Sequence, residues 1–359
     1  MHISKLALII SSLFAGCAGN GMPPGMGGDD GGGDDDGEVP FTSGVSTLSG
    51  AAMAGYVDGA RKVARFANPV NVAYRDGQVY VADFDNGKLR VIDADTHVTR
   101  TLVAQPSFQR PFGLAFAANG MLYVSTDNDQ NGNHTVMSGT IWRVDVESGA
   151  AAVLANAIGR PRGLAVLPDG RLAVADYVHH VIELVDPHTG AVTPIAGAWD
   201  VQGMVDGAGA TARFSAPYSL AVRGDGKLIV ADYDNNRIRL VGIDGTTATL
   251  SGAGDPGFVD GAMAEARFSH PQAVSIAAGG DVLITDLGNF RVRRITGDRV
   301  ETIAGNGTGG YADTDDRLAS QLYGLEGLAV VPDGSMVYVA DGNRGESQPY
   351  NRVRQIKLD

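Results

Sequence analysis

Cysteine is nearly absent from this chain of 359 residues, in which Cys17 is the single example. Neither an intrachain disulfide nor a zinc site built from cysteines can therefore form. Positive charge is also scarce, because 28 Lys and Arg stand against 41 Asp and Glu, for a formal net charge of −13. Nucleic-acid binders need clustered cations to displace counterions, so we expect no nucleic-acid partner. The sequence also lacks a Gly-x-Ser-x-Gly elbow and a phosphate-binding loop, which leaves nucleophilic and phosphoryl-transfer chemistry without a motif.

The apolar run at the start of the chain is too short to span a bilayer. It follows Lys5 and ends in small residues, a pattern that predicts an export signal over residues 1–16. Residues 13–17 resemble a bacterial lipobox, which implies that Cys17 is lipidated and anchors the protein in the cell envelope. Ala18 after the cysteine implies the outer membrane rather than the inner one. An ordinary cleaved secretory signal is the alternative.

Residues 17–43 consist mainly of Gly, Asp, Pro, Asn and Met, with almost no large β-branched or aromatic side chains. Such a segment cannot offset the entropy of ordering by burying apolar surface, so we predict a disordered tether behind the lipidated cysteine. Its acidic run from Asp29 to Glu38 could instead chelate calcium, although it has neither spaced ligands nor a defining turn.

One sequence phrase recurs six times after the tether. A typical copy starts with Pro, a variable residue and a small residue, continues to an apolar run ending in Val-Ala-Asp, and then reaches Arg-apolar-Arg. Each copy holds three β-branched runs separated by tight turns, and a fourth run lies between copies. Five copies begin at Pro69, Pro111, Pro161, Pro217 and Pro271, and the sixth has Glu326 at its second position.

Four antiparallel strands in each of six copies predict an all-β, six-bladed β-propeller over residues 44–359. Blades of this kind bury their faces only against their neighbours, so the ring must close. The last copy stops at its third strand, whereas Val45–Ser49 stand without a partner before the first copy. We therefore predict that this N-terminal strand completes the last four-stranded blade and removes exposed sheet edges.

The turn and third strand of several copies resemble the NHL repeat, over about residues 45–358. The resemblance implies an NHL-type propeller, but it leaves the function open because NHL propellers include enzymes, ligand binders and RNA binders. The segments that carry it are Asp176–Ile182, Asp232–Arg239 and Asp286–Val292. It is supported by three linkers that match one another: Gly55–Phe66, Gly203–Phe214 and Gly257–Phe268.

The loop before each innermost strand and the turn after Val-Ala-Asp should open on one face of the propeller, with the insertions at residues 127–138 and 342–350. The second residue of each copy should ring the channel mouth on that face. This residue differs in every copy, so the ring is either a recognition surface for a peptide or glycan or solvated filler. Its members are Val70, Phe112, Arg162, Tyr218, Gln272 and Glu326.

The recurring aspartates are expected to be structural rather than catalytic, because a residue that recurs at the same position in many blades meets a structural need that the blades share. We expect each carboxylate to accept hydrogen bonds in the polar turn or to pair with the arginine of the next strand. The set comprises Asp83, Asp176, Asp232, Asp286 and Asp341 at the ends of second strands, and Asp58, Asp206 and Asp260 in the linkers.

The insertion of the second copy fits the start of a calcium loop. Asp127, Asp129 and Asn131 place oxygen ligands at alternate positions, and the segment resembles the calcium hairpins of some propellers. Thr135 and Ser138 stand where a later Asp or Glu would close the coordination sphere. A plain polar loop is therefore the alternative.

These features predict a monomeric, envelope-tethered binding scaffold that recognises a peptide, protein or glycan, touches the membrane only through its lipid anchor and has no catalytic residues. The alternative is a metal-dependent, lactonase-like hydrolase or lyase with Asn71 and Glu326 as channel ligands. A channel zinc held by three histidines is not expected, because only His134 and His270 lie on the channel side.

Overall fold

Short runs of β-branched and aromatic residues, each bounded by tight turns, form the strands of this protein. The computed structural model describes residues 41 and 43–358. The predicted export signal, the lipidation site Cys17 and nearly all of the predicted tether lie outside the described residues. In the described part, no helix is long and apolar enough to cross a membrane. Its helices are the 3-10 turns η1 (Gly209–Thr211), η2 (Leu287–Asn289) and η3 (Arg317–Ala319).

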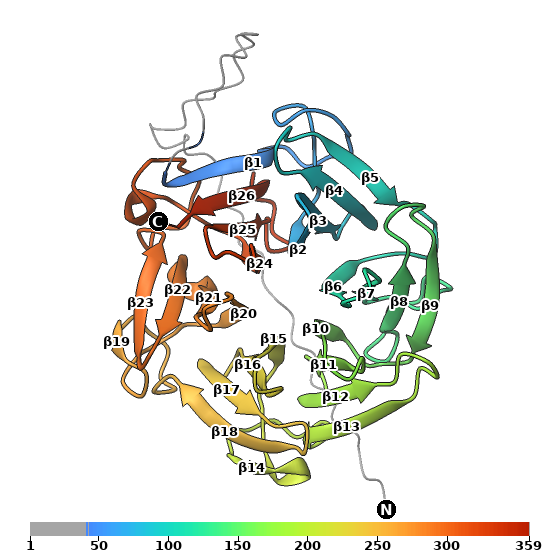
Figure 1. The fold of residues 1–359 in the computed structure, drawn as a ribbon, viewed down its shortest axis with the longest axis vertical. Helices are drawn as coiled ribbons and strands as arrows, with labels where there is room; N and C mark the ends of the chain where they lie inside the picture. The colour runs from blue at the N-terminus through green and yellow to red at the C-terminus, as the bar shows by residue number, and fades with distance from the viewer. Residues whose placement is uncertain (1–40, 42, 359) are drawn as a thin grey trace, which may run out of the picture. The chain divides into compact units, whose positions relative to one another are not determined.

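Six antiparallel sheets stand around a common axis as the blades of a propeller (Figure 1), as predicted. Blade 1 contains β2 (Pro69–Arg75), β3 (Gln78–Asp83), β4 (Lys88–Asp93) and β5 (Thr99–Val103), and blade 2 contains β6 (Pro111–Phe116), β7 (Leu122–Thr126), β8 (Thr140–Val144) and β9 (Ala151–Asn156). Blade 3 contains β10 (Pro161–Val166), β11 (Leu172–Asp176), β12 (Val181–Val185) and β13 (Val192–Gly197), and blade 4 contains β15 (Pro217–Val222), β16 (Leu228–Asp232), β17 (Arg237–Val241) and β18 (Thr246–Ser251). Blade 5 contains β20 (Pro271–Ile276), β21 (Val282–Asp286), β22 (Arg291–Thr296) and β23 (Arg299–Ala304), and blade 6 contains β24 (Leu325–Val330), β25 (Met336–Asp341), β26 (Asn351–Lys357) and β1 (Val45–Ala51).

The N-terminal strand closes the ring. β1 pairs antiparallel with β26, so that Val45 lies opposite Ile356 and Ala51 opposite Asn351. It forms the outer strand of blade 6 (Figure 1), next to the last strand of the described chain. The prediction that the first strand completes the last blade is confirmed, and closure leaves no blade without two neighbours.

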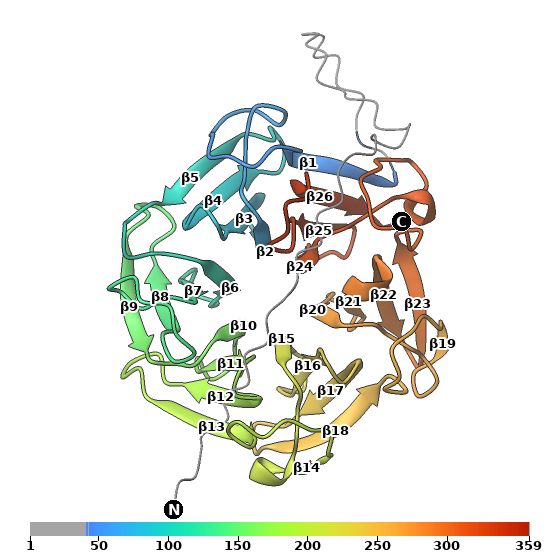
Figure 2. The ribbon, with the colours of Figure 1, turned by 180° about the vertical axis from the view of Figure 1, so that it is seen from behind.

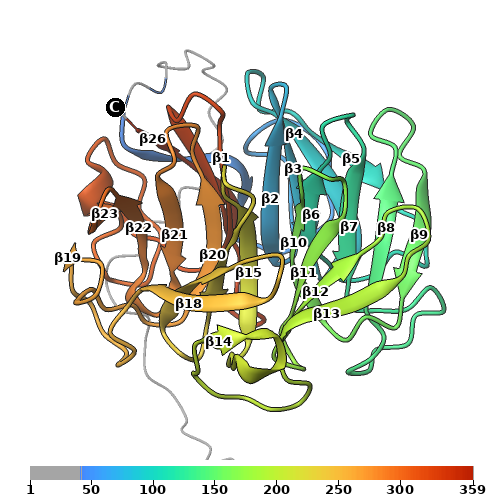
Figure 3. The ribbon, with the colours of Figure 1, turned by 60° about the horizontal axis from the view of Figure 1, so that its bottom comes forward.

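Apolar clusters fill the spaces between neighbouring blades. In one cluster, Ile229 of blade 4 and Ile284 of blade 5 pack around Phe268, which comes from the linker between the two blades. Phe214 and Phe66 belong to the corresponding clusters of other blades, and all of these side chains are completely buried. The innermost strands of neighbouring blades stand side by side (Figure 3), and each blade buries its faces against the blades next to it.

The repeated linkers run along the outer edge of the fourth strand. β14 (Gly207–Ala208) pairs with β18, and β19 (Gly261–Ala262) pairs with β23. Blades 4 and 5 therefore have five strands, not the predicted four. In blade 1 the same position is a single bridge between Gly59 and Thr99. The linkers thereby cover sheet edges that would otherwise offer unpaired backbone groups to another chain.

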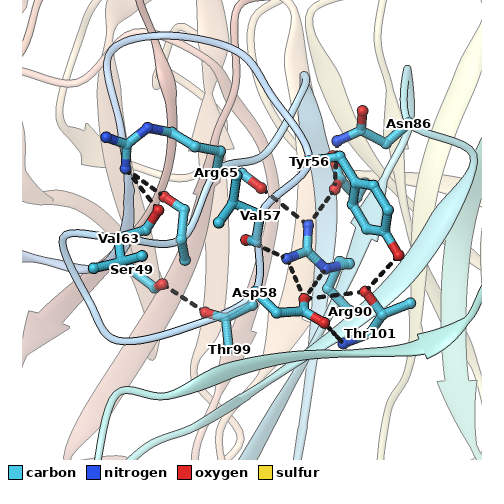
Figure 4. A network of polar contacts seen from close by, with 12 residues as sticks. Ser49, Tyr56, Val57, Asp58, Val63, Arg65, Asn86, Arg90, Thr99 and Thr101 are labelled. Atoms are coloured by element: carbon cyan, nitrogen blue, oxygen red, sulfur yellow. Dashed lines mark hydrogen bonds and ion pairs between the residues drawn. The ribbon is translucent and has the colours of Figure 1, made fainter.

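A buried arginine joins the recurring aspartates in four blades. In blade 1, Arg90 Nη1 donates to Asp83 Oδ2 at 2.8 Å. Arg90 Nη2 donates to Asp58 Oδ1 at 2.6 Å (Figure 4). The same guanidinium donates to the backbone carbonyls of Val57 and Arg65. The aspartates of these blades therefore have the predicted structural role. The equivalent arginines, also completely buried, are Arg239, Arg293 and Arg354.

Blades 2 and 3 replace this arginine. In blade 2, Trp142 Nε1 donates to Thr126 Oγ1 at 2.9 Å, so a neutral pair stands in for the ion pair. In blade 3, Glu183 occupies the arginine position and is 2% exposed, while Asp176 Oδ2 lies 2.6 Å from His179 Nδ1. Burial, and then the charge of Asp176, raises the pKa of Glu183 to about 7.

Candidate functional site

The six innermost strands, β2, β6, β10, β15, β20 and β24, line the axis (Figure 1, Figure 2). At one end, the loop before an innermost strand is hydrogen-bonded to the turn after the second strand. Asp127 N donates to Arg110 O at 3.1 Å, and Tyr177 N donates to Arg160 O at 3.2 Å. We call this end the top face. The prediction that both sets of loops share one face is confirmed.

The predicted mouth residues converge on the axis at the top face. The rings of Phe112 and Tyr218 lie 5.5 Å apart although they belong to blades 2 and 4. Gln272 Nε2 lies 3.5 Å from Glu326 Oε2, which joins blades 5 and 6. Each of the six blades contributes one residue to this set, which is more buried than an open ring. Tyr218 is half-buried, and Val70, Phe112, Arg162, Gln272 and Glu326 are each at most 8% exposed.

A row of aromatic side chains crosses the top face. Its members, in order, are Phe84, Phe112, Tyr218, Tyr233 and His270. The centroids of consecutive rings are separated by 6.1, 5.5, 5.3 and 4.7 Å. Phe84, Tyr233 and His270 are half-buried. These rings give the top face an apolar wall with polar edges, which is typical of ligand sites.

Sequence reasoning missed three of the aromatic residues at the top face. Phe84, Tyr177 and Tyr233 each follow the recurring Asp at the end of a second strand. This position also differs between most copies, although Tyr177 and Tyr233 repeat the same residue type. The same variability argument would therefore have found them.

Two arginines and one aspartate lie beside the aromatic row. Arg160 Nη2 and Arg162 Nη2 contact the same atom, Asp127 Oδ2, at 2.7 and 2.9 Å. The side chain of Asp127 is completely buried, and those of Arg160 and Arg162 are 23% and 9% exposed. The guanidinium carbon of Arg162 also lies 4.2 Å from the centroid of the Phe112 ring.

Unpartnered polar atoms concentrate at the top face. Among the described residues, eleven buried side-chain nitrogen or oxygen atoms have no hydrogen-bond partner, and seven of them lie here. Buried polar atoms in native proteins nearly always have a partner, which can be water or a ligand. The seven atoms are Asp127 Oδ1, Asn128 Oδ1, Arg160 Nε, Arg162 Nε, Arg162 Nη1, Gln272 Oε1 and Glu326 Oε1.

Glu326 is the titratable group most affected by this environment. Burial raises its pKa to about 8, against the opposing charges of Arg162 and Arg344 and the hydrogen bond from Gln272. At neutral pH its carboxyl group is therefore mostly protonated and can donate a hydrogen bond. Burial likewise raises the pKa of Tyr218, so its hydroxyl stays neutral.

The candidate calcium residues have other partners in this structure. Asp127 contacts the two arginines, whereas Asp129 Oδ1 accepts from Asn131 N and Asn133 N, each at 2.8 Å. Asp129 and Asn131 line a hollow of about 430 Å³. In the described part of the chain, no group of three or more His, Cys, Asp or Glu side chains could hold a metal ion. The calcium loop remains a prediction.

The other candidate metal ligands are spread over the top face. His134 lies 3.1 Å from Arg110 Nη1, and His270 packs on the ring of Tyr233. Asn71 Oδ1 accepts a hydrogen bond from Val72 N at 2.8 Å and lies against Gly327, the residue that follows Glu326. The structure does not show the predicted pair of channel ligands in contact.

Comparison with curated proteins relates the chain to NHL repeat proteins. No family model matches. The chain is 26% identical over 275 residues to Protein SUPPRESSOR OF QUENCHING 1, chloroplastic, of Arabidopsis thaliana, an alignment that covers 67% of this chain and 26% of that protein. It is 24% identical over 318 residues to NHL repeat-containing protein 2 of Gallus gallus, covering 82% of this chain and 40% of that protein. The chain thus spans less than half the length of these relatives.

Solved structures share the fold. A Bacteroides thetaiotaomicron protein of unknown function has a TM-score of 0.71 at 18% identity, covering 89% of this chain and 76% of its own. An auxiliary nutrient binding protein from Bacteroides ovatus has a TM-score of 0.69 at 20% identity, covering 89% and 78%. A putative gluconolactonase has a TM-score of 0.54 at 13% identity, covering 89% and 93%. The chain is a six-bladed β-propeller homologous to the NHL repeat-containing proteins.

Proposed function

We propose that this protein is a binding scaffold whose top face recognises a peptide, protein or glycan. The proposal includes export and attachment to the bacterial cell envelope through Cys17, with the propeller as a monomeric receptor. The ligand would lie on the aromatic row, with its polar groups directed at the axis between Arg162, Gln272 and Glu326.

The unpartnered polar atoms on both sides of the axis carry this proposal. Arg162 provides free donors, Gln272 a free acceptor and Glu326 a free carboxyl oxygen, although each of the three residues is more than nine-tenths buried. A few convergent polar groups beside an apolar wall are the usual composition of a ligand site. If these side chains only filled the channel and bound no ligand, their polar groups would stay unsatisfied at a cost of about 1–3 kcal/mol each.

The solved structures with this fold are consistent with a binding role. Two of them are described as auxiliary nutrient binding proteins, from Bacteroides thetaiotaomicron and Bacteroides ovatus. A putative gluconolactonase has the same fold, so the likeness alone neither separates binding from catalysis nor identifies the ligand. The choice between a peptide, a protein and a glycan depends on the top face of this chain.

Replacing Tyr233 with alanine should weaken binding of the ligand. The half-buried ring packs against Tyr218 at 5.3 Å and against His270 at 4.7 Å, so its loss removes part of the apolar wall. We expect a loss of about 2 kcal/mol, or roughly 30-fold in Kd. Ligands identified on peptide and glycan arrays would be titrated against both proteins by calorimetry.

Tyr74→Ala is the matched control for this test. Tyr74 lies near the far end of β2 and stacks on Tyr338 at 5.6 Å, away from the top face. An unchanged Kd in Tyr233→Ala, together with a weakened Kd in Tyr74→Ala, would refute the proposed location of the site.

Metal analysis distinguishes the scaffold from the lactonase-like alternative. We expect protein purified without chelator to contain no metal that depends on Glu326, because Asn71 Oδ1 accepts from Val72 N and Glu326 is hydrogen-bonded to Gln272. Elemental analysis would compare the wild type with Glu326→Ala and Asp127→Ala. A stoichiometric metal lost only in Glu326→Ala would favour the enzyme, whereas calcium lost only in Asp127→Ala would establish the loop site.

A further inference from the structure

The arginine pair at the top face carries one positive charge more than its internal partner can neutralise. Arg160 and Arg162 share a single carboxylate oxygen of Asp127, at 2.7 and 2.9 Å. Two cations on one anion leave one net positive charge in a largely buried place. A buried charge is costly unless it is paired, so this arrangement favours a negatively charged partner.

From this charge and the free donors beside it, we propose that the ligand carries a carboxylate group that binds to Arg160 and Arg162. This inference rests on the proposed function and specifies the chemistry of the ligand. Arg160 Nε and both Arg162 Nε and Nη1 are buried donors without partners. Guanidinium groups bind carboxylates through short, charge-assisted hydrogen bonds, which makes them suited to this group.

One net charge suits a monoanion, and the aromatic row suits a flat apolar body attached to it. Tyr218 and Tyr233 present such a surface next to Arg162, whose guanidinium carbon lies 5.8 Å from the Tyr218 ring centroid. A peptide that ends in an aromatic residue and a uronic acid both combine a carboxylate with a face that can stack on these rings. They are two sources of the same recognised group.

Calorimetric titration with matched acids and neutral analogues tests the inference. The probes are N-acetylphenylalanine against its amide, and glucuronate against glucose. We expect at least one acid to bind about tenfold or more tightly than its neutral analogue. Preference for N-acetylphenylalanine would indicate a peptide terminus, and preference for glucuronate would indicate an acidic glycan.

Arg160→Gln tests the contribution of the positive charge. The side chain of Arg160 is 23% exposed, so its replacement disturbs packing less than replacement of Arg162 would. We expect the affinity for the acid to fall about tenfold and that for the neutral analogue to stay unchanged. Arg299→Gln, an exposed arginine on the outer strand β23, is the control.

Equal binding of acid and neutral analogue, or no binding of either acid at millimolar concentration, would overturn the carboxylate inference. Neutral probes that bind and are weakened by Tyr233→Ala would leave the proposed function in place while removing this inference. Acid binding that persists unchanged in Arg160→Gln would also overturn it. Melting curves of each variant show whether the fold is retained.

Discussion

Replacing Arg239 with methionine is expected to lower the free energy of unfolding by about 3–5 kcal/mol. The guanidinium is completely buried and donates to Asp232 at 2.6 Å, to Asp206 at 2.6 Å and to two backbone carbonyls. Methionine fills much of the same volume but leaves the buried carboxylate of Asp232 without its cation. Burial already raises the pKa of Asp232 to about 6, against the opposing charge of Arg239.

Chemical denaturation of Arg239→Met and of a surface control measures this effect. The control is Arg223→Met, which breaks a solvent-exposed pair with Asp225 and should cost at most about 1 kcal/mol. The double variant Arg239→Met/Asp232→Asn should recover part of the loss, because it removes the uncompensated charge. A loss in Arg239→Met no larger than that of the control would show that the buried pair is not a main support of the blade.

Replacing Glu183 with glutamine is expected to make the protein less sensitive to rising pH. The folded-state pKa of Glu183 is about 7, above its ordinary value of 4.5, because the side chain is buried next to Asp176. The folded protein therefore holds this proton more tightly than the unfolded chain, and stability falls as the pH rises from about 4.5 to about 7. The difference between the two pKa values corresponds to about 3 kcal/mol.

The measurement is the free energy of unfolding of both proteins at about pH 4 and about pH 8. Relative to the wild type, Glu183→Gln should gain about 3 kcal/mol between the two conditions, because glutamine does not ionise. Glu147→Gln, which changes an exposed glutamate of blade 2, should show no such gain. If Glu183→Gln follows the same pH curve as the wild type, Glu183 does not titrate as its burial implies.

The repeated phrase was sufficient to predict the ring, because each blade is built from local signals that recur. The aspartates confirmed this: Asp83 and Asp232 pair with the arginine seven residues later, in the next strand. The fifth strands of blades 4 and 5 were missed. Gly207–Ala208 has no β-branched residue, and it pairs only because the linker passes the edge of β18.

The candidate site was predicted in part. Position in the repeat correctly placed Phe112 and Tyr218 near the axis at the top face. Sequence spacing groups Asp127 with Asp129 and Asn131, whereas in the structure Asp127 pairs with Arg160 and Arg162 of the next blade. Spacing along a loop could not reveal those partners, because they come from another blade.

By itself the sequence determined the number of blades, the four strands that every blade shares and the closure of the ring by β1, because these depend on patterns that each copy repeats. Only the tertiary structure decided which side chains meet at the axis and how deeply they are buried. Whether the second residue of an innermost strand is solvated or buried depends on the second residues of the other five innermost strands, which face it across the axis. The excess charge at Arg160 and Arg162, and the raised pKa of Glu326, follow from that packing.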